Sequence, residues 1–312
     1  MNIALLNLLA DGQAHSYTTL SQALAITLST LTEQIAELQQ QGVQLVQLAE
    51  TCQWLPAAEL LARPFLQQAL PNNTLIIQPV INSTNQYLLD RIATLPNNSV
   101  CLAEYQTAGR GRRGRKWHSP FAGQVILSFY RQFPNTVNLS GLSLAVGIAT
   151  AQALTHLGYQ QVQLKWPNDI WLAGKKLGGI LIEMKQQAAL ARYDVVIGLG
   201  LNVHFPADLQ LDQPIAMLSQ QKPLNRNTVI AEIIKQFNQV LDRFTANGLS
   251  PLLPFWQQYD YFYQKEVKLL LEKQTITGIN QGVNANGELC LQREDSSIVT
   301  FAIGEVSLRE KF

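Results

Sequence analysis

Apolar residues in the first part of the chain recur at the spacing of an amphipathic helix. The recurring positions are Leu28, Leu31, Ile35 and Leu38. Because they lie three or four residues apart, they fall on one face of a helix. Ser29 is the expected N-cap of this helix, and Gly42 is expected to end it.

Shorter patterns surround this helix. Residues 2–10 and 19–26 are expected to form helices as well, with a short strand at 43–46 and another apolar patch at 54–55. Short helices followed by a small β-ribbon are typical of a winged helix-turn-helix. A small helical module that mediates protein contacts is the alternative interpretation of the same pattern.

The middle of the chain mixes strand and helix patterns, and a connecting helix is expected before it at 60–72. The expected strands are 75–80, 100–104, 124–130, 162–166, 180–184 and 194–203, and the expected helices are 85–95, 142–157 and 228–245. Several strands between 162 and 203 follow one another without a helix. The pattern therefore predicts an α+β fold with a mixed central sheet, not a doubly wound parallel sheet.

The last part of the chain, from 266 to 309, contains short strand patterns. Turns are expected at 280–282 and 286–287, where Asn and Gly cluster. Short strands separated by such turns predict a small β-barrel. The expected domains are 1–62, 63–264 and 265–312.

Composition limits the class of protein. The chain has 312 residues, 47% hydrophobic and 14% charged, which is enough apolar material for a folded core and excludes a disordered chain. Its net charge of +1 excludes a polycation that coats nucleic acid or membrane. The three cysteines are widely separated, no apolar run approaches the roughly 18 residues of a membrane span, and the start lacks the basic region of a signal peptide. These features predict a cytoplasmic protein with no membrane contact.

Charge is distributed unevenly along this nearly neutral chain. Residues 1–62 contain no Lys or Arg. Their acidic residues are Asp11, Glu33, Glu37, Glu50 and Glu59. By contrast, residues 109–117 read GRGRRGRKW, in which the basic residues are Arg110, Arg112, Arg113, Arg115 and Lys116. Segments so different in charge are expected to have different roles.

The segment GRGRRGRKW, called here the arginine–glycine loop, suits an anionic ligand. Glycine lets the backbone approach a ligand closely, and arginine clamps phosphate or carboxylate by paired hydrogen bonds. The GxxxxGK[ST] pattern of a P-loop is absent. An exposed nucleic-acid patch is the alternative, but Trp117 and the flanking strand patterns favour a built pocket. Like charges this dense are expected to keep the loop mobile until an anion binds.

A second candidate site is LKWPNDIWLAGKKLGGILIE, residues 164–183. The PND sequence is typical of a turn, and the side-chain oxygens of Asn168 and Asp169 suit Mg²⁺ or a polar ligand. Lys175 and Lys176 precede a very apolar strand, and a lysine at the mouth of that strand could reach a carboxylate or phosphate. The alternative is a plain hairpin with both lysines in solvent.

A third candidate is the start of an expected helix at Ser83, Thr84 and Asn85. A helix N-terminus offers free N–H groups to a polar ligand, although simple capping explains the same residues. The four histidines show no metal-ligand spacing, so no resident metal site is predicted. No Ser–His–Asp or catalytic Cys arrangement is indicated.

Taken together, these segments resemble the biotin–protein ligases. The segments that carry the resemblance are NSTNQYLLDR (82–91), AEYQTAGRGRRGRKWHSP (103–120), KWPNDI (165–170), KLGGILIE (176–183) and GLGLNV (198–203). The winged-helix pattern at the start and GEVSLR (304–309) near the end are similar to the bifunctional bacterial form, a biotin ligase and biotin-operon repressor in one chain. Lipoate–protein ligases share the fold, but they are not expected to carry the arginine–glycine loop.

The resemblance implies a two-step reaction on a biotin/lipoate ligase-like central domain, followed by an SH3-like barrel. The biotin carboxylate attacks the α-phosphate of MgATP, giving biotinyl-5′-adenylate and pyrophosphate. A lysine of the biotin carboxyl carrier protein of acetyl-CoA carboxylase then attacks this mixed anhydride.

The resemblance also implies residue roles. The implied biotin contacts are Ser83, Thr84, Asn85, Gln106, Arg110, Gly111, Arg112, Lys176 and Gly179. The implied nucleotide contacts are Arg112, Arg115, Trp117, Asn168, Asp169 and Asn202. Lys176 and Arg112 are the implied catalytic residues, with Lys176 between the biotin carboxylate and the α-phosphate. Residues 106–119 and 204–215 are expected to become ordered on ligand binding.

Binding to operator DNA is the least supported implication. Lys and Arg supply most of the phosphate affinity of DNA-binding domains, and residues 1–62 have none. Neutral polar side chains and helix N-termini also bind phosphate, so repression stays open. One rival is a repurposed winged helix that aids ligand affinity or carrier contacts. Another is a purely biotin-responsive regulator, against which Lys176 and the arginine–glycine loop argue. A homodimer formed on adenylate binding is implied by the resemblance alone.

Overall fold

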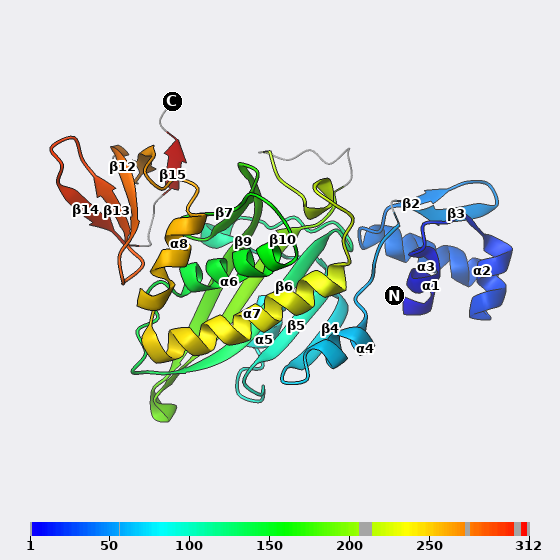
Figure 1. The fold of residues 1–312 in the computed structure, drawn as a ribbon. Coiled ribbons are helices and arrows are strands. Elements are labelled where there is room, and N and C mark those ends of the chain that lie inside the picture. The colour runs from blue at the N-terminus through cyan, green and yellow to red at the C-terminus, as the bar shows by residue number, and fades with distance from the viewer. Residues whose placement is uncertain (1, 56, 206–213, 272–274, 303–306, 311–312) are drawn as a thin grey trace.

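The fold has three parts that follow one another along the chain. The structure is a computed structural model that describes residues 2–55, 57–205, 214–271, 275–302 and 307–310. Figure 1 shows an N-terminal helical unit at one end, a large central sheet with long helices on it, and a small C-terminal sheet at the other end. None of the described helices has the length and apolarity that a membrane crossing requires. The α+β class and the mixed central sheet expected from the sequence are confirmed.

The N-terminal unit packs helices on a small antiparallel sheet. Its helices are α1 (Ile3–Leu9), α2 (Tyr17–Leu24) and α3 (Leu28–Gln40), and its strands in sheet order are β1 (His15–Ser16), β3 (Thr51–Trp54) and β2 (Leu45–Gln47). On α3 the buried residues are Leu31, Ile35 and Leu38, as the helical period predicts. Leu28 is 54% exposed because it begins the helix, beyond the packed turns.

Local boundaries in this unit differ from those expected. The N-cap of α3 is Thr27, not Ser29, since Thr27 Oγ1 accepts a hydrogen bond from the Thr30 amide at 3.2 Å. Helix α2 begins before residue 19 because Ser16 caps it by accepting from the Thr19 amide at 3.0 Å. Strand β1 was not expected, because its two residues are defined only by pairing with β3.

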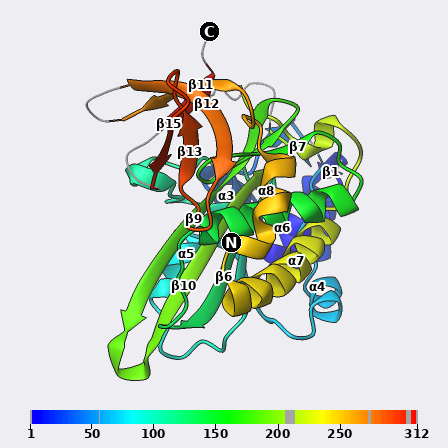
Figure 2. The same ribbon diagram turned by 60° about the vertical axis from the view of Figure 1, so that its left-hand side comes forward.

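The central sheet has seven strands in the described residues. In sheet order they are β4 (Thr74–Ile81), β5 (Ser99–Gln106), β6 (Gln124–Pro134), β10 (Arg192–Asn202), β9 (Lys175–Gln187), β8 (Asp169–Leu172) and β7 (Val162–Lys165). Only β4 and β5 run parallel, and every other neighbouring pair is antiparallel. Strands β9 and β10 form a long hairpin (Figure 2), and β6 pairs with β10 along its whole length.

Helices cover both faces of this sheet. The main ones are α4 (Arg63–Ala69), α5 (Thr84–Leu89), α6 (Leu142–His156), α7 (Arg226–Asn247) and α8 (Leu253–Tyr259). Successive residues of a strand point to opposite faces. Phe129 of β6 belongs to the large core under α6 and α7, whereas Tyr130 belongs to the small core under α5. Helix α5 therefore packs on the second face.

Some central elements differ from the sequence pattern. Helix α5 ends at Leu89 instead of continuing to residue 95, because the chain turns over 90–94. Strand β8 and helix α8 were not expected. Strand β8 is short and begins at the last residue of the PND turn, and helix α8 has Pro254 in its first turn, where proline is tolerated.

The C-terminal sheet is antiparallel and packs onto the central core. Its order in the described residues is β14 (Ile298–Phe301), β13 (Leu289–Gln292), β12 (Thr275–Val283), β11 (Glu266–Leu270) and β15 (Ser307–Glu310). Buried residues of this sheet, such as Val267 and Leu289, join the same apolar cluster as α6 and α7. The turn at 286–287 is confirmed. The turn expected at 280–282 is wrong, because these residues form an irregular step within β12, where the register against β13 shifts.

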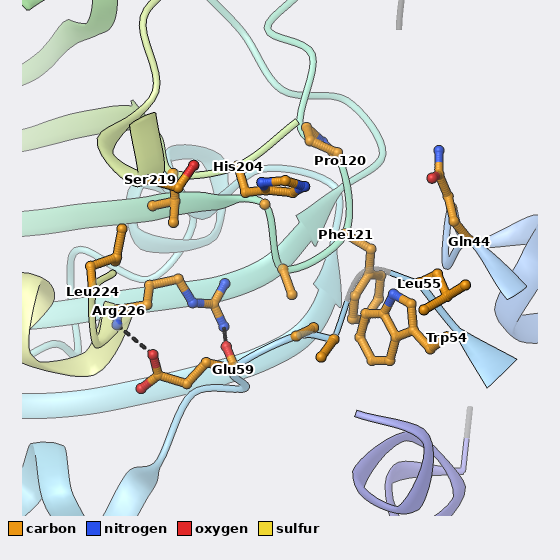
Figure 3. A pocket seen from close by; sticks show the side chains of 16 residues that line it. Gln44, Trp54, Leu55, Glu59, Pro120, Phe121, His204, Ser219, Leu224 and Arg226 are labelled. Carbon is orange, nitrogen blue, oxygen red and sulfur yellow. Dashed lines mark hydrogen bonds between the residues drawn. The ribbon is translucent and has the colours of Figure 1, made fainter. Parts of the chain in front are cut away.

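The N-terminal unit is fixed to the central sheet by an aromatic contact (Figure 3). Phe121, from the segment just after the arginine–glycine loop, belongs to the apolar cluster of the N-terminal unit. Its ring lies 5.6 Å from that of Trp54, edge to face, and 6.1 Å from that of Tyr105, stacked. Beside it, buried Arg226 donates to the Glu59 carbonyl and to the Glu104 carboxylate. A cavity of about 250 Å³ lies at this junction.

Candidate functional site

A cavity of about 670 Å³ lies beside the arginine–glycine loop and the strands of the central sheet. It brings together every residue that the resemblance implies. These are Ser83, Thr84, Asn85, Gln106, Arg110, Gly111, Arg112, Arg115, Trp117, Asn168, Asp169, Lys176, Gly179 and Asn202. They come from segments up to 119 positions apart, so only the folded chain makes them one site.

The start of α5 forms one polar wall of the cavity. Ser83 caps the helix by accepting from the Gln86 amide at 3.4 Å, and it also lines the cavity. Gln106 Oε1 accepts hydrogen bonds from the Thr84 amide at 2.9 Å and from its hydroxyl at 3.1 Å. The buried Ser128 hydroxyl lies 2.5 Å from Asn85 Oδ1. These side chains are held in place before any ligand arrives.

Glycines of β10 make room for two of the lining side chains. A Cβ on Gly198 would lie 2.4 Å from Asn85 Oδ1, and a Cβ on Gly200 would lie 2.6 Å from the Trp117 indole. Both glycines point to one face of the strand because they are two residues apart. The GLGLN segment therefore lets the cavity wall approach the sheet backbone closely.

The arginine–glycine loop folds back on itself as a narrow hairpin. Gly111 donates its amide to the Arg115 carbonyl at 2.7 Å, and Trp117 donates to the Gly109 carbonyl at 2.9 Å. Arg113 at the tip has a left-handed φ of 58°. Ordering of the loop by ligand stays a prediction, and residues 206–213 of the other segment expected to order lie outside the described residues.

A hydrogen-bonded series fixes the aromatic wall of the cavity. The Trp117 indole donates to Gln124 Oε1 at 3.0 Å, and Gln124 Nε2 donates to Asn202 Oδ1 at 2.8 Å. Asn202 Nδ2 then donates to the Ala216 carbonyl at 3.2 Å. Gln124 and Asn202 are buried, so their amide groups satisfy one another away from solvent.

Two basic side chains contact the PND turn, one from the arginine–glycine loop and one from β9. Arg112 Nη1 donates to Asn168 Oδ1 at 2.6 Å, and Lys176 Nζ lies 2.8 Å from Asp169 Oδ1. Burial, reinforced by neighbouring Arg113, lowers the pKa of the Arg112 guanidinium. Lys175, next along the chain, is exposed and does not line the cavity. Arg112 and Lys176 therefore place two cationic groups in one small volume.

Carboxylates are scarce in this volume. Asp169 is the only carboxylate among the described residues that line the cavity. Within the described part of the chain, no three His, Cys, Asp or Glu side chains cluster as metal ligands. With a single carboxylate and several Arg and Lys side chains in its described lining, the cavity suits anions.

Known proteins are similar to this chain in sequence and in fold. The model of the biotin/lipoate A/B protein ligase family matches residues 77–202, and that of the biotin protein ligase C-terminal domain matches residues 264–309. The bifunctional ligase/repressor BirA of Salmonella typhimurium is 38% identical, over 98% of this chain and 97% of its own. The chain belongs to the biotin–protein ligase family. The Escherichia coli bifunctional ligase/repressor BirA is 37% identical over the same shares of both chains.

A solved structure of a biotin–protein ligase also matches. The enzyme from Aquifex aeolicus, in complex with biotin and ATP, has a TM-score of 0.67 and 27% identity, and the match covers 76% of this chain and 99% of that chain. Family membership therefore rests both on the sequence of nearly the whole chain and on the fold of about three quarters of it.

The sequence pattern of this biotin–protein ligase family member did not single out several polar residues that line the cavity or contact its lining. Gln124 and Ser128 are buried polar residues within the otherwise apolar pattern QVILSFY, and that contrast was their only signal. Lys165 is buried, lines the cavity and places Nζ 4.6 Å from the Trp171 ring centre. Glu183 ends the KLGGILIE segment and contacts two of the expected site residues.

Proposed function

We propose that this chain is an ATP-dependent biotin–protein ligase that joins biotin, through biotinyl-5′-adenylate, to a lysine of a biotin carboxyl carrier protein. The observation that carries the proposal is the meeting of Arg112 and Lys176 at the PND turn, in a cavity walled by the capped start of α5. Two anions must approach each other for adenylation, so cations held in place lower the barrier. The two curated relatives that match nearly the whole chain are named ligases.

In this proposal the wall at α5 holds the biotin head. Ser83, Thr84 and Asn85 offer hydroxyl and amide groups, and Gln106 supports Thr84. Arg110 and Gly111 lie in the loop above, and Gly179 leaves space near Lys176. The ureido head of biotin needs both donors and acceptors, which these neutral groups supply.

The other end of the cavity takes the nucleotide. Trp117 offers an aromatic face, and Asn202 fixes it through Gln124. Arg112 and Arg115 face the phosphates, while Lys176 stands between the biotin carboxylate and the α-phosphate. In the free protein Lys176 pairs with Asp169, so this cation is already positioned before substrate arrives.

Mg²⁺ would enter with ATP. This ion prefers oxygen ligands and is usually held by one or two carboxylates together with substrate phosphates. The oxygens of Asp169 and Asn168 fit that description, because they lie on one turn beside the expected triphosphate position. When bound, the metal would neutralise phosphate charge, and Asp169 is the side chain placed to hold it.

Biotin-dependent exchange of labelled pyrophosphate into ATP tests the first step, and transfer of labelled biotin to a carrier protein tests the second. We expect both, and lipoate should not replace biotin. Absence of biotin-dependent exchange by the folded, full-length protein would remove the proposal. Pyrophosphate exchange with lipoate in place of biotin would identify the protein as a lipoate-type acyl ligase instead.

A second function, repression at operator DNA, is favoured by the names of the two full-length relatives. The helices and antiparallel ribbon of residues 2–54 fit a winged helix-turn-helix, with α3 as the recognition helix. Exposed residues of α3 include Ser29, Thr32 and Glu33, and no Lys or Arg lies anywhere in 1–62. Such a unit lacks the counterion-releasing contacts that give most DNA-binding proteins their affinity.

Binding of labelled DNA from the biotin-synthesis promoter, with biotin and ATP present, decides this point. Neutral contacts alone predict weak binding with a shallow salt dependence. Tight binding that falls steeply with salt would show that cations from another part of the chain reach DNA. No binding at any salt would leave the N-terminal unit as a repurposed winged helix.

The remaining architectural expectations form part of this proposal. The five-stranded C-terminal sheet fits a small SH3-like barrel, and the domain limits at 62 and 264 fit the three parts of the fold. Dimerisation on adenylate binding is expected from the family resemblance, and sedimentation velocity with and without biotin and ATP tests it. A monomer under both conditions would contradict it.

A further inference from the structure

Glu183 connects the arginine–glycine loop to the wall of the cavity. Arg110 Nη2 lies 3.1 Å from Glu183 Oε1 and 3.0 Å from Oε2, so both carboxylate oxygens accept from this loop residue. The same Oε2 accepts a hydrogen bond from Asn85 Nδ2 at 2.8 Å. One carboxylate thus contacts a residue of the loop and a residue of the wall.

The position of Glu183 follows from the register of the sheet. In β9 it lies opposite Val196 of β10, and Val196 belongs to the small core under α5. Its side chain therefore lies on the face where α5 presents Asn85. The Asn85 amide is held at both of its atoms, because its oxygen accepts from the Ser128 hydroxyl at 2.5 Å and its nitrogen also donates to the Leu181 carbonyl at 3.3 Å.

Glu183 does not itself belong to the cavity lining. Its carboxylate side chain is 26% exposed and that of Arg110 is 41% exposed, so the pair is partly screened by solvent. A pair of this kind is weak enough to open and close, yet it biases the loop toward the closed arrangement. This combination suits a segment that must admit substrate and then retain a reactive intermediate.

We propose that Glu183 is a positioning residue that holds the arginine–glycine loop over the cavity through Arg110 and orients Asn85 at the same time. Retention of the adenylate by this ion pair rests on the proposed ligase function. Closure of the loop does not, since the contacts are present in the free protein.

Substitution can separate the two contacts. Glu183→Gln keeps an oxygen that accepts from Asn85 but removes the charge that attracts Arg110. Glu183→Ala removes both. The matched control is Asp242→Asn, which neutralises an exposed carboxylate of α7 that pairs with Arg131 of β6, and neither residue lines the cavity. All variants are checked by circular dichroism and thermal melting before use.

Limited trypsin digestion of the free, full-length protein measures loop opening, because the loop contains five basic residues at which trypsin cuts. Cleavage of a transiently open segment follows its open population. We expect cleavage at 110–116 to be about two- to fivefold faster in Glu183→Gln, as loss of a partly exposed ion pair implies, and unchanged in Asp242→Asn. Equal cleavage in wild type and Glu183→Gln would overturn the proposal.

A double-variant comparison tests whether Glu183 acts through Arg110. In an Arg110→Gln background, Glu183→Gln should add nothing to the cleavage rate. Fully additive effects would show that Glu183 influences the loop in another way, and they would overturn the pairing.

Release of preformed adenylate, followed by a chase with unlabelled biotin and ATP, tests retention. We expect release to be about two- to fivefold faster in Glu183→Gln, with less dependence on salt than in wild type. Glu183→Ala should also raise the KM for biotin, because Asn85 loses its partner. Faster cleavage with unchanged release would overturn retention. If the wild-type protein makes no adenylate and Glu183→Gln is still cleaved faster than wild type, the ligase function is overturned and the positioning role of Glu183 remains.

Discussion

Lys176→Ala is the substitution that most directly tests the proposed chemistry. Lys176 Nζ lies 2.8 Å from Asp169 Oδ1, and its side chain is 23% exposed. The lysine stands on β9, and Arg112 of the arginine–glycine loop donates to Asn168 on the same turn. Alanine removes the cation but leaves the strand and the turn unchanged.

The size of the effect follows from this partial exposure. At about 4 Å and an effective dielectric constant of about 20, a unit charge stabilises an opposite unit charge by about 4 kcal/mol. Loss of one positioned donor to a developing oxyanion usually costs about 3–4 kcal/mol. The two values agree, and they correspond to a rate reduction of roughly 10²–10³.

The fold should survive this loss. Asp169 loses its partner, but it is partly exposed, so water can solvate the carboxylate and the stability cost is expected to be about 1 kcal/mol or less. A drop in adenylation much larger than any drop in stability would therefore be a loss of chemistry.

Pyrophosphate exchange at saturating biotin and ATP measures the adenylation rate directly. Lys175→Ala is the matched control, because it removes an adjacent lysine that is exposed and does not line the cavity. We expect near-normal exchange in the control and a loss of roughly 10²–10³ in Lys176→Ala. Wild-type exchange in Lys176→Ala would refute the role of this lysine, and equal losses in both variants would show that net charge alone matters.

Three further predictions follow from the contacts described. Arg112→Gly removes the guanidinium that donates to Asn168, so the adenylate should dissociate faster, and unchanged dissociation in a chase experiment would contradict this. Phe121→Ala empties the contact with Trp54 and should lower the free energy of unfolding by about 3 kcal/mol in urea titrations; a loss near zero would show that the N-terminal unit does not depend on this ring. Burial raises the pKa of Asp260 to about 6, so between about pH 4 and 6 the folded protein keeps a proton that the unfolded chain has released. The free energy of unfolding should therefore fall with rising pH across this window, by up to about 3 kcal/mol, and a slope that persists in Asp260→Asn would disprove the assignment.

The parts of the fold that were predicted correctly are those that local pattern determines. The helical period of α3 and the apolar runs of β6 and β10 are properties of short segments, and the structure places them where the pattern does. The elements that were missed depend on contacts with distant residues. Strand β1 exists because His15 pairs with Cys52, and nothing in the two residues themselves favours a strand.

The same distinction applies to the candidate site. Glycine, arginine and proline in fixed order mark the loop and the PND turn, so their residues could be named from the sequence. The partners that hold them could not. Glu183 reaches Arg110 across 73 positions, and it does so only because the register of β9 against β10 puts it on the side of α5. That register depends on the turn between β9 and β10 and on the partner strand, so it could not be assigned from the residues around Glu183 alone.

Phe121 shows that a boundary in amino-acid composition need not be a boundary between folded units. The change from acidic residues to the arginine–glycine loop suggests that the first 62 residues form a separate unit. Yet this unit completes its core with Phe121, which lies four positions after Trp117 in the cavity wall. Movement of the loop stem would have to pull that ring from between Trp54 and Tyr105, at the cost of apolar contact. The segment from Trp117 to Phe121 is therefore fixed at both ends. Trp117 is held by its hydrogen bond to Gln124, and Phe121 is held in the N-terminal core. The hairpin of the arginine–glycine loop is the part left free to open.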